Sequence, residues 1–277
     1  MTLTLFLLLL FVGVANGFYS GLMGTGGNVI LIPALDLVLA PFGMEEQELV
    51  KFIIAHSLFV TVFNGLSVSY KHYRINNFFV KEVLLIGIPA FMAAYIMSEI
   101  IKTSQWYDKL YFDLLFLFLI LLVAIRFLFY KHVHAISNRQ DKMQKGIFAY
   151  SGLGAFTGIV SALSGFGGGI VLIPSLTDIF GIPIKKVSSI SIGVVMLLAI
   201  SVSISYLNVG SSVKVHQILP NQFGYISLSL VVPILIGVFL AAPFGVRVGQ
   251  RTSPSVLRLV FGAVMVLIGV KIIIGLL

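Results

Sequence analysis

Long apolar runs separated by short polar loops follow one another along almost the whole chain. The runs cover roughly residues 3–23, 28–41, 48–70, 78–100 and 109–130 in the first half, and roughly 146–163, 169–180, 187–207, 222–245 and 255–277 in the second. They are solidly apolar, whereas the strands of a membrane barrel alternate apolar and polar residues. The pattern therefore predicts an all-α polytopic membrane protein.

The composition indicates that lipid is the solvent for most of the chain. Of the 277 residues, 58% are hydrophobic and only 10% are charged, compared with about 25% charged residues in soluble domains. The formal charge of +8 comes from basic residues at the ends of apolar runs, which is typical of topology-setting charges rather than of nucleic-acid binding. We therefore expect a multi-pass protein of the cell (plasma or inner) membrane, surrounded by lipid and without a nucleic-acid partner. The N-terminal run is interpreted as a retained first segment.

A seventeen-residue segment occurs twice, near the starts of two halves of similar length. Gly17–Pro33 reads GFYSGLMGTGGNVILIP and Gly158–Pro174 reads GIVSALSGFGGGIVLIP, with a constant separation of 141 residues and no gap. The identical positions are Gly17, Ser20, Leu22, Gly24, Gly26, Gly27, Leu31, Ile32 and Pro33. This self-similarity divides the chain into a first transmembrane repeat (1–130), a cytoplasmic linker (131–145) and a second transmembrane repeat (146–277).

The basic residues predict how the repeats lie in the membrane. The linker carries four Lys or Arg residues and one Asp, so we expect it to be cytoplasmic. Counting spans from the linker places three further basic loops inside, namely those around Lys71 and Arg74, Lys185 and Lys186, and Arg247 and Arg251. Equivalent loops of the two repeats then fall on opposite faces, which predicts inverted-topology repeats with both termini outside.

The glycine-rich centre of each copy allows two arrangements of the flanking helical arms. Either both arms span the bilayer, which places the two glycine turns at opposite surfaces, or each pair forms a re-entrant hairpin and both turns meet in the middle. The second arms have about 12–14 apolar residues and reach about 18–21 Å, short of the roughly 30 Å hydrocarbon core. We therefore favour two glycine-tipped broken or re-entrant hairpins, each followed by three transmembrane helices.

Glycine at these turns leaves no side chain between a ligand and the backbone N–H groups. Each second arm begins just past its turn, so its free N–H groups and the positive end of its dipole point at the turn, as in anion-binding helix N-termini. The predicted substrate-binding residues at the turns are Thr25, Gly26, Gly27, Asn28, Phe166, Gly167, Gly168 and Gly169. Close helix packing is the alternative role for the glycines. It explains Gly17, Gly21, Gly24, Gly154 and Gly158 well and the consecutive Gly167–Gly169 poorly.

Other polar residues within the apolar runs are weaker candidates. His56 and Ser57 in the run 48–70, and Ser191 in the run 187–207, are expected to contribute to a substrate site, with proton coupling as a second role for His56. A neutral His56 that only hydrogen-bonds a neighbouring helix is equally compatible with the sequence. Asp36 and Asp178 are interpreted as capping or interfacial residues. Glu99, Lys102 and Lys109 are interpreted as a solvated rim, and Arg126 as snorkelling to the cytoplasmic headgroups.

The paired glycine motifs, the segment pattern and the length resemble the sulfite exporter TauE/SafE family of membrane transporters, over essentially the whole chain. The resemblance implies transport, mostly export, of small anions such as sulfite, sulfoacetate and other organosulfur or carboxylate anions, and coupling to an ion gradient in some members. The first copy has Asn28 where the second has Gly169, and Thr25 where the second has Phe166. The two halves of the site are therefore unequal, and the identity of the substrate does not carry over.

Three functions compete at this point. The leading hypothesis is a secondary transporter whose two halves rock about the glycine hairpins, with a proton or sodium ion as coupling ion and a homodimer as one allowed assembly. A passive anion channel is the second. The third is an intramembrane hydrolase with Ser164 as nucleophile and His56 as base, although Met23 occupies the position equivalent to Ser164. We expect no enzyme, since an enzyme has little use for an inverted second copy, and no cofactor. We expect no metal site, since the chain has no cysteine and its histidines show no metal-site spacing.

Overall fold

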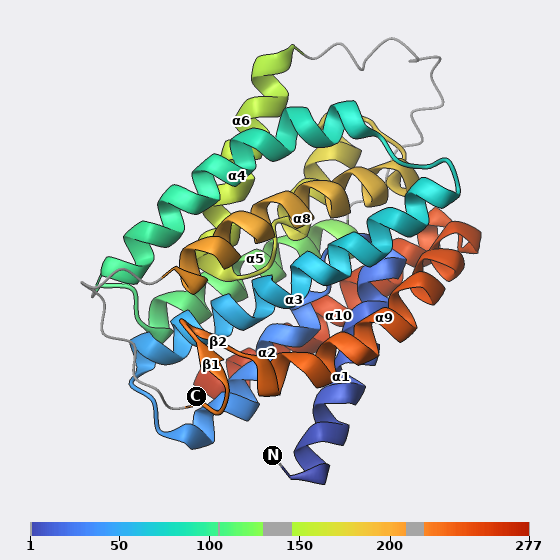
Figure 1. Cartoon of the computed structure of the whole chain (residues 1–277). Coiled ribbons are helices and arrows are strands. Elements are labelled where there is room, and N and C mark those ends of the chain that lie inside the picture. Colours follow the sequence, from blue (N-terminus) through green and yellow to red (C-terminus); the bar gives the residue numbers. More distant parts are fainter. Residues whose placement is uncertain (1, 105, 130–145, 209–218, 277) are drawn as a thin grey trace.

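The computed structural model describes residues 2–104, 106–129, 146–208 and 219–276 (Figure 1). The predicted cytoplasmic linker therefore lies outside the described residues. The elements are α1 (Leu3–Met23), α2 (Asn28–Leu39), η1 (Ala40–Phe42), α3 (Glu46–Arg74), α4 (Val80–Thr103), α5 (Lys109–Phe129), α6 (Ile147–Ser164), α7 (Gly169–Pro174), the π-helical turn η2 (Ser175–Ile179), α8 (Ile184–Leu207), β1 (Gln222–Phe223), β2 (Ile226–Ser227), α9 (Leu228–Arg251) and α10 (Pro254–Leu276).

The described chain is almost entirely helical, with one short antiparallel pair of strands, β1 and β2. Seven of its helices, α1, α3, α4, α6, α8, α9 and α10, are long and apolar enough to cross a membrane. Two shorter apolar helical segments, 28–42 and 169–179, follow the glycine turns. These elements confirm the prediction of an all-α, multi-pass membrane protein.

Two helices, α3 and α8, form the centre of the molecule and are the most buried of the candidate spans. They pack against each other, and α5 packs against α10. The first helix of each predicted repeat packs most extensively against the fourth helix of the other, since α1 lies along α9 and α6 lies along α4. The first helix of each half therefore packs mainly against a helix of the other half (Figure 1).

Close helix packing explains some of the glycines. A Cβ atom added at positions 13, 17 and 21 of α1 would strike the backbone of residues 234, 238 and 242 of α9 in turn. The matching order of these contacts shows that α1 and α9 run in the same direction. In α6, Gly154 and Gly158 face the backbone of Ile86 and Ala90 in the same way. The structure thus has the close helix packing that was the alternative role for four of the glycines, namely Gly17, Gly21, Gly154 and Gly158.

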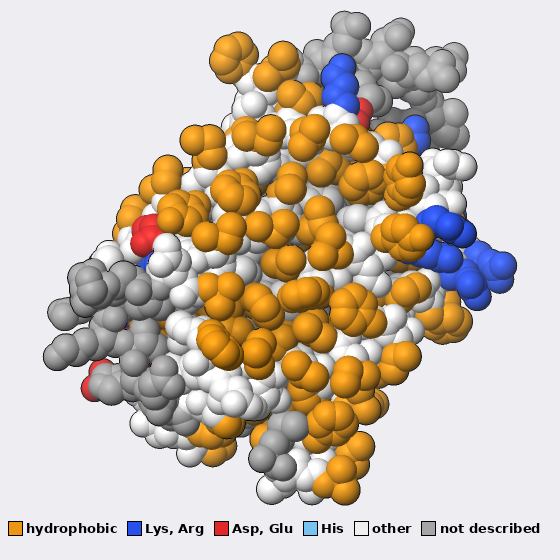
Figure 2. All heavy atoms as spheres, viewed as in Figure 1, with side chains coloured by type: hydrophobic (Ala, Val, Ile, Leu, Met, Phe, Trp, Pro, Cys, Tyr) orange, Lys and Arg blue, Asp and Glu red, His pale blue; other side chains and the backbone are white. Residues whose placement is uncertain are grey.

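Three loops that the charge pattern assigned to the cytoplasm meet at one end of the molecule. Asn77 Nδ2 donates to Lys185 O (3.1 Å), Lys185 Nζ donates to Gln250 O (2.7 Å), and Lys186 Nζ lies 5.5 Å from the ring centre of Phe79. Figure 2 shows basic side chains gathered at one edge of a broad hydrophobic surface. The loops are therefore neighbours, and the orientation of this end towards the cytoplasm stays a prediction.

The interpretation of a solvated rim is wrong for Lys102, and Lys109 is ion-paired although its side chain is 27% exposed. Lys102 is only 4% exposed; its Nζ donates to Ser205 O (2.6 Å) and pairs with Glu99 (2.7 Å). Lys109 Nζ lies 3.0 Å from carboxylate oxygens of both Asp36 and Asp113. Lys102 is covered by α8, so its ammonium group binds a carbonyl group and a carboxylate in place of water.

Candidate functional site

Two glycine-rich turns with the same backbone conformation are the centre of the candidate site. The first turn, Gly24–Gly27, joins α1 to α2, and the second turn, Gly165–Gly168, joins α6 to α7. Each turn contains three glycines with φ between +70° and +89°. L-residues with side chains rarely adopt these angles, so the conformation requires glycine at these positions.

The two turns touch each other deep inside the molecule. Asn28 Nδ2 donates a hydrogen bond to Gly165 O (2.6 Å), and Gly169 lies against the backbone of Thr25. One glycine of each turn also lies against Val195, near the midpoint of α8. The helix N-termini that the sequence predicts to form the site are therefore brought together.

Polar side chains of α3 hold the turns in place. Thr61 Oγ1 donates to Asn28 Oδ1 (2.6 Å) and Asn64 Nδ2 donates to Gly26 O (2.9 Å). Ser57 Oγ lies 3.4 Å from the carbonyl oxygen of Gly165 in the second turn, while its shorter hydrogen bond, at 3.1 Å, goes to Ile54 O in its own helix. The spacing of these three residues places them on one face of the helix. That spacing was the signal that could have added Thr61 and Asn64 to the predicted site.

The first amides of α2 and α7 remain without partners. The backbone N–H groups of Asn28, Val29, Gly169 and Ile170 find no hydrogen-bond acceptor in the described part of the chain. Amides at the first turn of a helix have no partner within the helix, and together with the helix dipole they favour a negatively charged ligand. The geometry can therefore bind an anion through backbone groups.

All predicted site residues are buried in this structure. They are Thr25, Gly26, Gly27, Asn28, His56, Ser57, Phe166, Gly167, Gly168, Gly169 and Ser191. The Phe166 ring stacks on Phe116 of α5, with 4.1 Å between ring centres. Ser191 Oγ has no hydrogen-bond partner among the described residues. Protein therefore encloses the turns on at least two sides: α5 covers the side of Phe166, and α3 covers the side of Asn28.

His56 is bonded away from the turns. Its Nδ1 lies 2.7 Å from Phe52 O, and its Nε2 lies 2.9 Å from the backbone N of Ser227. The ring therefore accepts from Ser227 at Nε2 and donates from Nδ1, as a neutral imidazole does. This arrangement is the one in which His56 ties α3 to the segment that begins α9. Its contribution to a substrate site stays a prediction.

The groups of the hydrolase hypothesis are not paired with each other. Ser164 Oγ donates to Val160 O (2.7 Å) in its own helix, while both ring nitrogens of His56 are occupied by backbone groups. A serine nucleophile requires a base within hydrogen-bond reach. The structure gives no support for this alternative.

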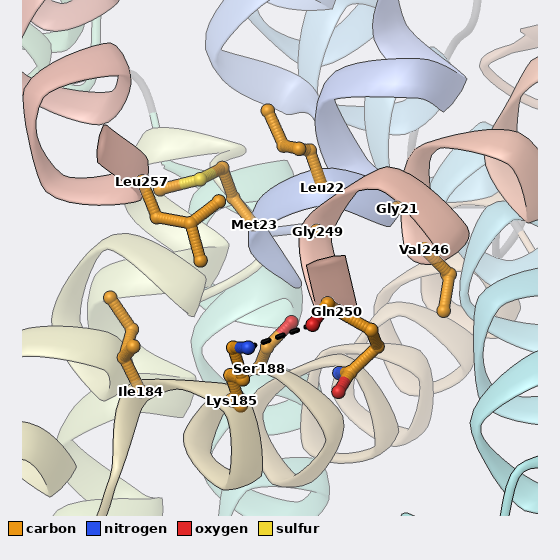
Figure 3. A pocket seen from close by; sticks show the side chains of 10 residues that line it. All are labelled: Gly21, Leu22, Met23, Ile184, Lys185, Ser188, Val246, Gly249, Gln250 and Leu257. Carbon is orange, nitrogen blue, oxygen red and sulfur yellow. Dashed lines mark hydrogen bonds between the residues drawn. The ribbon is translucent and has the colours of Figure 1, made fainter. Parts of the chain in front are cut away.

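A small pocket lies beside the first turn (Figure 3). It is formed by the end of α1, the start of α8 and the end of α9, and its lining residues are Gly21, Leu22, Met23, Ile184, Lys185, Ser188, Val246, Gly249, Gln250 and Leu257. Ser188 of this lining contacts Gly24 of the first turn. The pocket has room for about one water molecule. Its lining therefore includes Lys185 from the end that carries the basic loops and Ser188 next to the first turn.

Ion pairs anchor the two short helical arms to the α5–α10 pair. Asp36 in α2 lies 3.0 Å from Lys109 and 3.7 Å from Lys271, at the start of α5 and near the end of α10. Asp178 in η2 lies 2.6 Å from Arg126 and 3.9 Å from Arg258, near the end of α5 and the start of α10. Asp36 and Asp178, which the sequence predicts to be capping or interfacial residues, therefore form ion pairs, and their position relative to the membrane surface stays a prediction.

The π-helical turn explains how both aspartates reach equivalent cations. Asp36 lies eight residues after Asn28, whereas Asp178 lies nine residues after the equivalent Gly169. The second arm therefore contains one extra residue, and the wider turn η2 (Ser175–Ile179) accommodates it. The gapless repeat ends shortly before this turn.

Comparisons with known proteins agree over almost the whole chain. Residues 8–272 match the family described as sulfite exporter TauE/SafE. A probable membrane transporter protein of Methanocaldococcus jannaschii is 30% identical over 262 residues, covering 95% of this chain and 93% of that protein. A probable membrane transporter protein of Haemophilus influenzae is 25% identical over 272 residues, covering 97% of this chain and 98% of that protein. No solved structure matches the chain significantly.

These matches and the seven apolar helices agree on a multi-pass membrane protein. The names of the family and of the relatives indicate a membrane transporter rather than an enzyme. A small-molecule substrate and a membrane environment follow from that class. The chain belongs to the sulfite exporter TauE/SafE family.

Proposed function

We propose that the protein is a secondary transporter of small anions, and specifically an exporter of sulfite, sulfoacetate or related organosulfur or carboxylate anions. One observation carries the proposal: two glycine turns touch near the midpoint of α8, and the first amides of α2 and α7 lack acceptors within the described chain. The substrate class also draws support from the description of the family as sulfite exporters.

The proposal includes an inverted pair of re-entrant hairpins. Turns placed at opposite membrane surfaces would be separated by the hydrocarbon core of roughly 30 Å, whereas Asn28 of one turn donates to Gly165 of the other. The lengths of the short arms agree, since 28–42 and 169–179 are shorter than the candidate spans. Broken helices that meet at the midplane are the usual binding-site architecture of secondary transporters.

Binding would use dipoles in place of a buried cation. The amides of Asn28, Val29, Gly169 and Ile170 face no acceptor of the described chain, and hydrogen bonds from such groups to an anion are roughly twice as strong as neutral ones. Thr25, Ser57, Phe166, Ser191 and the turn glycines are the proposed lining of the site. The burial of these residues corresponds to an occluded state, from which the site opens to one side at a time.

The pocket beside the first turn is the proposed entrance from the cytoplasm. Lys185 Nζ is bonded to the carbonyl of Gln250 in this pocket (2.7 Å; Figure 3). A carbonyl neutralises no charge, so the ammonium group keeps the positive field that attracts anions. An anion that entered here would reach Gly24, which contacts Ser188 of the pocket.

Transport by the purified protein in liposomes tests the proposal. Wild-type protein is expected to move labelled sulfite or a sulfonate, and Gly27→Leu and Gly168→Leu are each expected to abolish transport. Both positions have positive φ and face neighbouring atoms, so a side chain must displace the turn. Gly152→Leu is the matched control, because Gly152 lies in α6 with open space around it. Normal transport by both turn variants would disprove the turn site.

Gradients separate the transporter from a passive channel. A secondary transporter accumulates the labelled anion against its gradient when a proton or sodium gradient is imposed, whereas a channel only equilibrates it. Imposing each gradient alone also identifies the coupling ion. Equilibration under both conditions would replace the transporter with the channel.

A further inference from the structure

Asn16 is a buried amide that the proposed site has not yet used. It lies in α1 next to Gly17, which packs against Val238 near the midpoint of α9. Its side chain is 0% exposed, and neither its Nδ2 nor its Oδ1 has a hydrogen-bond partner among the described residues. The molecule therefore holds a complete, unsatisfied amide at the centre of a membrane helix.

Such a group is unusual because burying an unpaired polar group is unfavourable. An unsatisfied buried donor or acceptor costs about 1–3 kcal/mol, and lipid offers no alternative partner. Buried polar side chains that lack a protein partner therefore point to a ligand or to another polar group that binds there.

The side chain of Asn16 points at the first turn. A Cβ atom added at Gly27 would strike Asn16 Oδ1 and Asn16 O. Gly27 is the residue that precedes α2, a helix of 12 residues whose first amides, those of Asn28 and Val29, have no acceptor in the described chain. The Asn16 amide and the α2 N-terminus thus lie at the same turn. Asn16 Oδ1 is the atom next to Gly27, and the Nδ2 group on the same amide carbon is a donor without an acceptor.

The second turn lacks this arrangement. Thr157 is the residue equivalent to Asn16, and it lies against Gly168 as Asn16 lies against Gly27. Thr157 presents its Cγ2 methyl group to the turn, while its Oγ1 donates to Leu153 O (2.6 Å) in its own helix. The polar group at this position of the second turn is therefore already satisfied.

We propose that Asn16 is a substrate-contacting residue that makes the first turn the principal half of the anion site. In this arrangement its NH₂ group donates to one oxygen of a multi-oxygen anion, such as sulfite, a sulfonate or a carboxylate, while the α2 amides donate to another. Thr157 contributes only packing. This inference rests on the proposed function, because it assumes that an anion binds at the turns.

Anion binding and apo stability together test the role of Asn16. Asn16→Leu, which has a similar branched shape, and Asn16→Ala, which adds no bulk, are each expected to weaken sulfite binding and raise the KM for sulfite transport roughly tenfold or more. The thermal midpoint of anion-free Asn16→Leu is expected to equal that of wild type or exceed it, because the removed amide had no partner; Asn16→Ala leaves a cavity and serves only the binding measurement. A structural role for Asn16 would instead lower that midpoint.

Thr157→Val is the matched control, since it removes the hydroxyl and keeps the methyl group at the turn. It is expected to leave the Kd and KM for sulfite unchanged. If Asn16→Leu and Asn16→Ala bound sulfite with wild-type affinity, the proposed role of Asn16 would be overturned, but the proposed transport function would not. An equal loss in Thr157→Val would overturn the asymmetry. Wild-type protein that neither binds nor moves any anion would overturn the proposed function, and the role of Asn16 with it.

Discussion

The two glycine turns share a backbone conformation and differ in three side chains at or beside them, namely Asn16 against Thr157, Thr25 against Phe166 and Asn28 against Gly169. Both have three glycines in the left-handed region, at equivalent positions. The first turn carries Asn28, which bonds to the second turn and to Thr61 of α3, whereas the equivalent Gly169 has only its backbone to offer. The comparison teaches that the backbone conformation is what the repeat preserves, and that the side chains make the halves unequal.

Asn28 and Gly169 are the equivalent residues that differ most in their contacts, and replacing Gly169 by asparagine is expected to have the largest effect on stability and transport. Gly169→Asn would give the second turn the residue of the first, but its Cβ would lie 2.6 Å from Thr25 O. This overpacking is expected to push the turns apart, cost about 1–3 kcal/mol or more and abolish transport. Thermal unfolding in detergent and sulfite uptake measure the two effects. Full activity would mean that the contact between the turns is not needed.

The reverse exchange should have a smaller effect. Asn28→Gly removes the hydrogen bonds to Gly165 and Thr61 without adding bulk. Leaving buried partners unsatisfied is expected to cost about 1–3 kcal/mol of stability, and transport is expected to be reduced. Thr61→Val, which removes one of the two bonds, serves as the graded control in the same thermal and uptake assays. A larger loss in Thr61→Val than in Asn28→Gly would contradict this account.

Each short arm also carries an ion-paired aspartate, and these ion pairs are expected to contribute less to stability than the contacts of the turns. Asp36→Asn and Asp178→Asn are each expected to lower the thermal midpoint by an amount equivalent to about 1 kcal/mol or less, because these carboxylates are partly exposed. We expect the smaller change in Asp36→Asn, since Lys109 keeps Asp113 as a partner. High salt should reduce both differences, and insensitivity to salt would argue against ion pairing.

The smallest expected effect concerns the entrance, which adjoins the first turn. Lys185→Gln is expected to raise the KM for anions supplied from the proposed cytoplasmic side a few-fold at low salt, because it removes the cation from the pocket. Lys186→Gln is the control, since Lys186 lies over the ring of Phe79 and does not line the pocket. Equal KM values for the two variants would remove Lys185 from the path.

The turns were predictable because two copies of one unusual pattern are informative together. Consecutive glycines next to helix-length apolar runs left few conformations, and the structure has the predicted residues in contact. The contacts of polar residues within helices were harder to predict from the sequence. Thr61 and Asn64 bond to the turns, yet a Ser, Thr or Asn in an apolar run can equally bond to its own helix, as Thr157 does.

Long-range pairing was the part that the sequence could not give. The burial of Lys102 depends on Ser205, a hundred residues away, and the π-helical turn at Ser175–Ile179 follows from one extra residue beyond the ungapped repeat. Neither the pairing nor the wider turn has a local pattern. Asn16 was not predicted as a candidate for the same reason, since only the folded arrangement shows that its amide lacks a partner.

The exchange of helices between the halves limits how the molecule can move. Because α1 lies along α9 and α6 along α4, with glycines against the partner's backbone, sliding within either pair would break tight backbone contacts. Rocking of residues 1–130 as one body against 146–277 would require such sliding. Any rigid unit in the proposed transport cycle should therefore combine helices from both halves of the chain, and fragments made by cutting between the repeats should regain activity only when they assemble together.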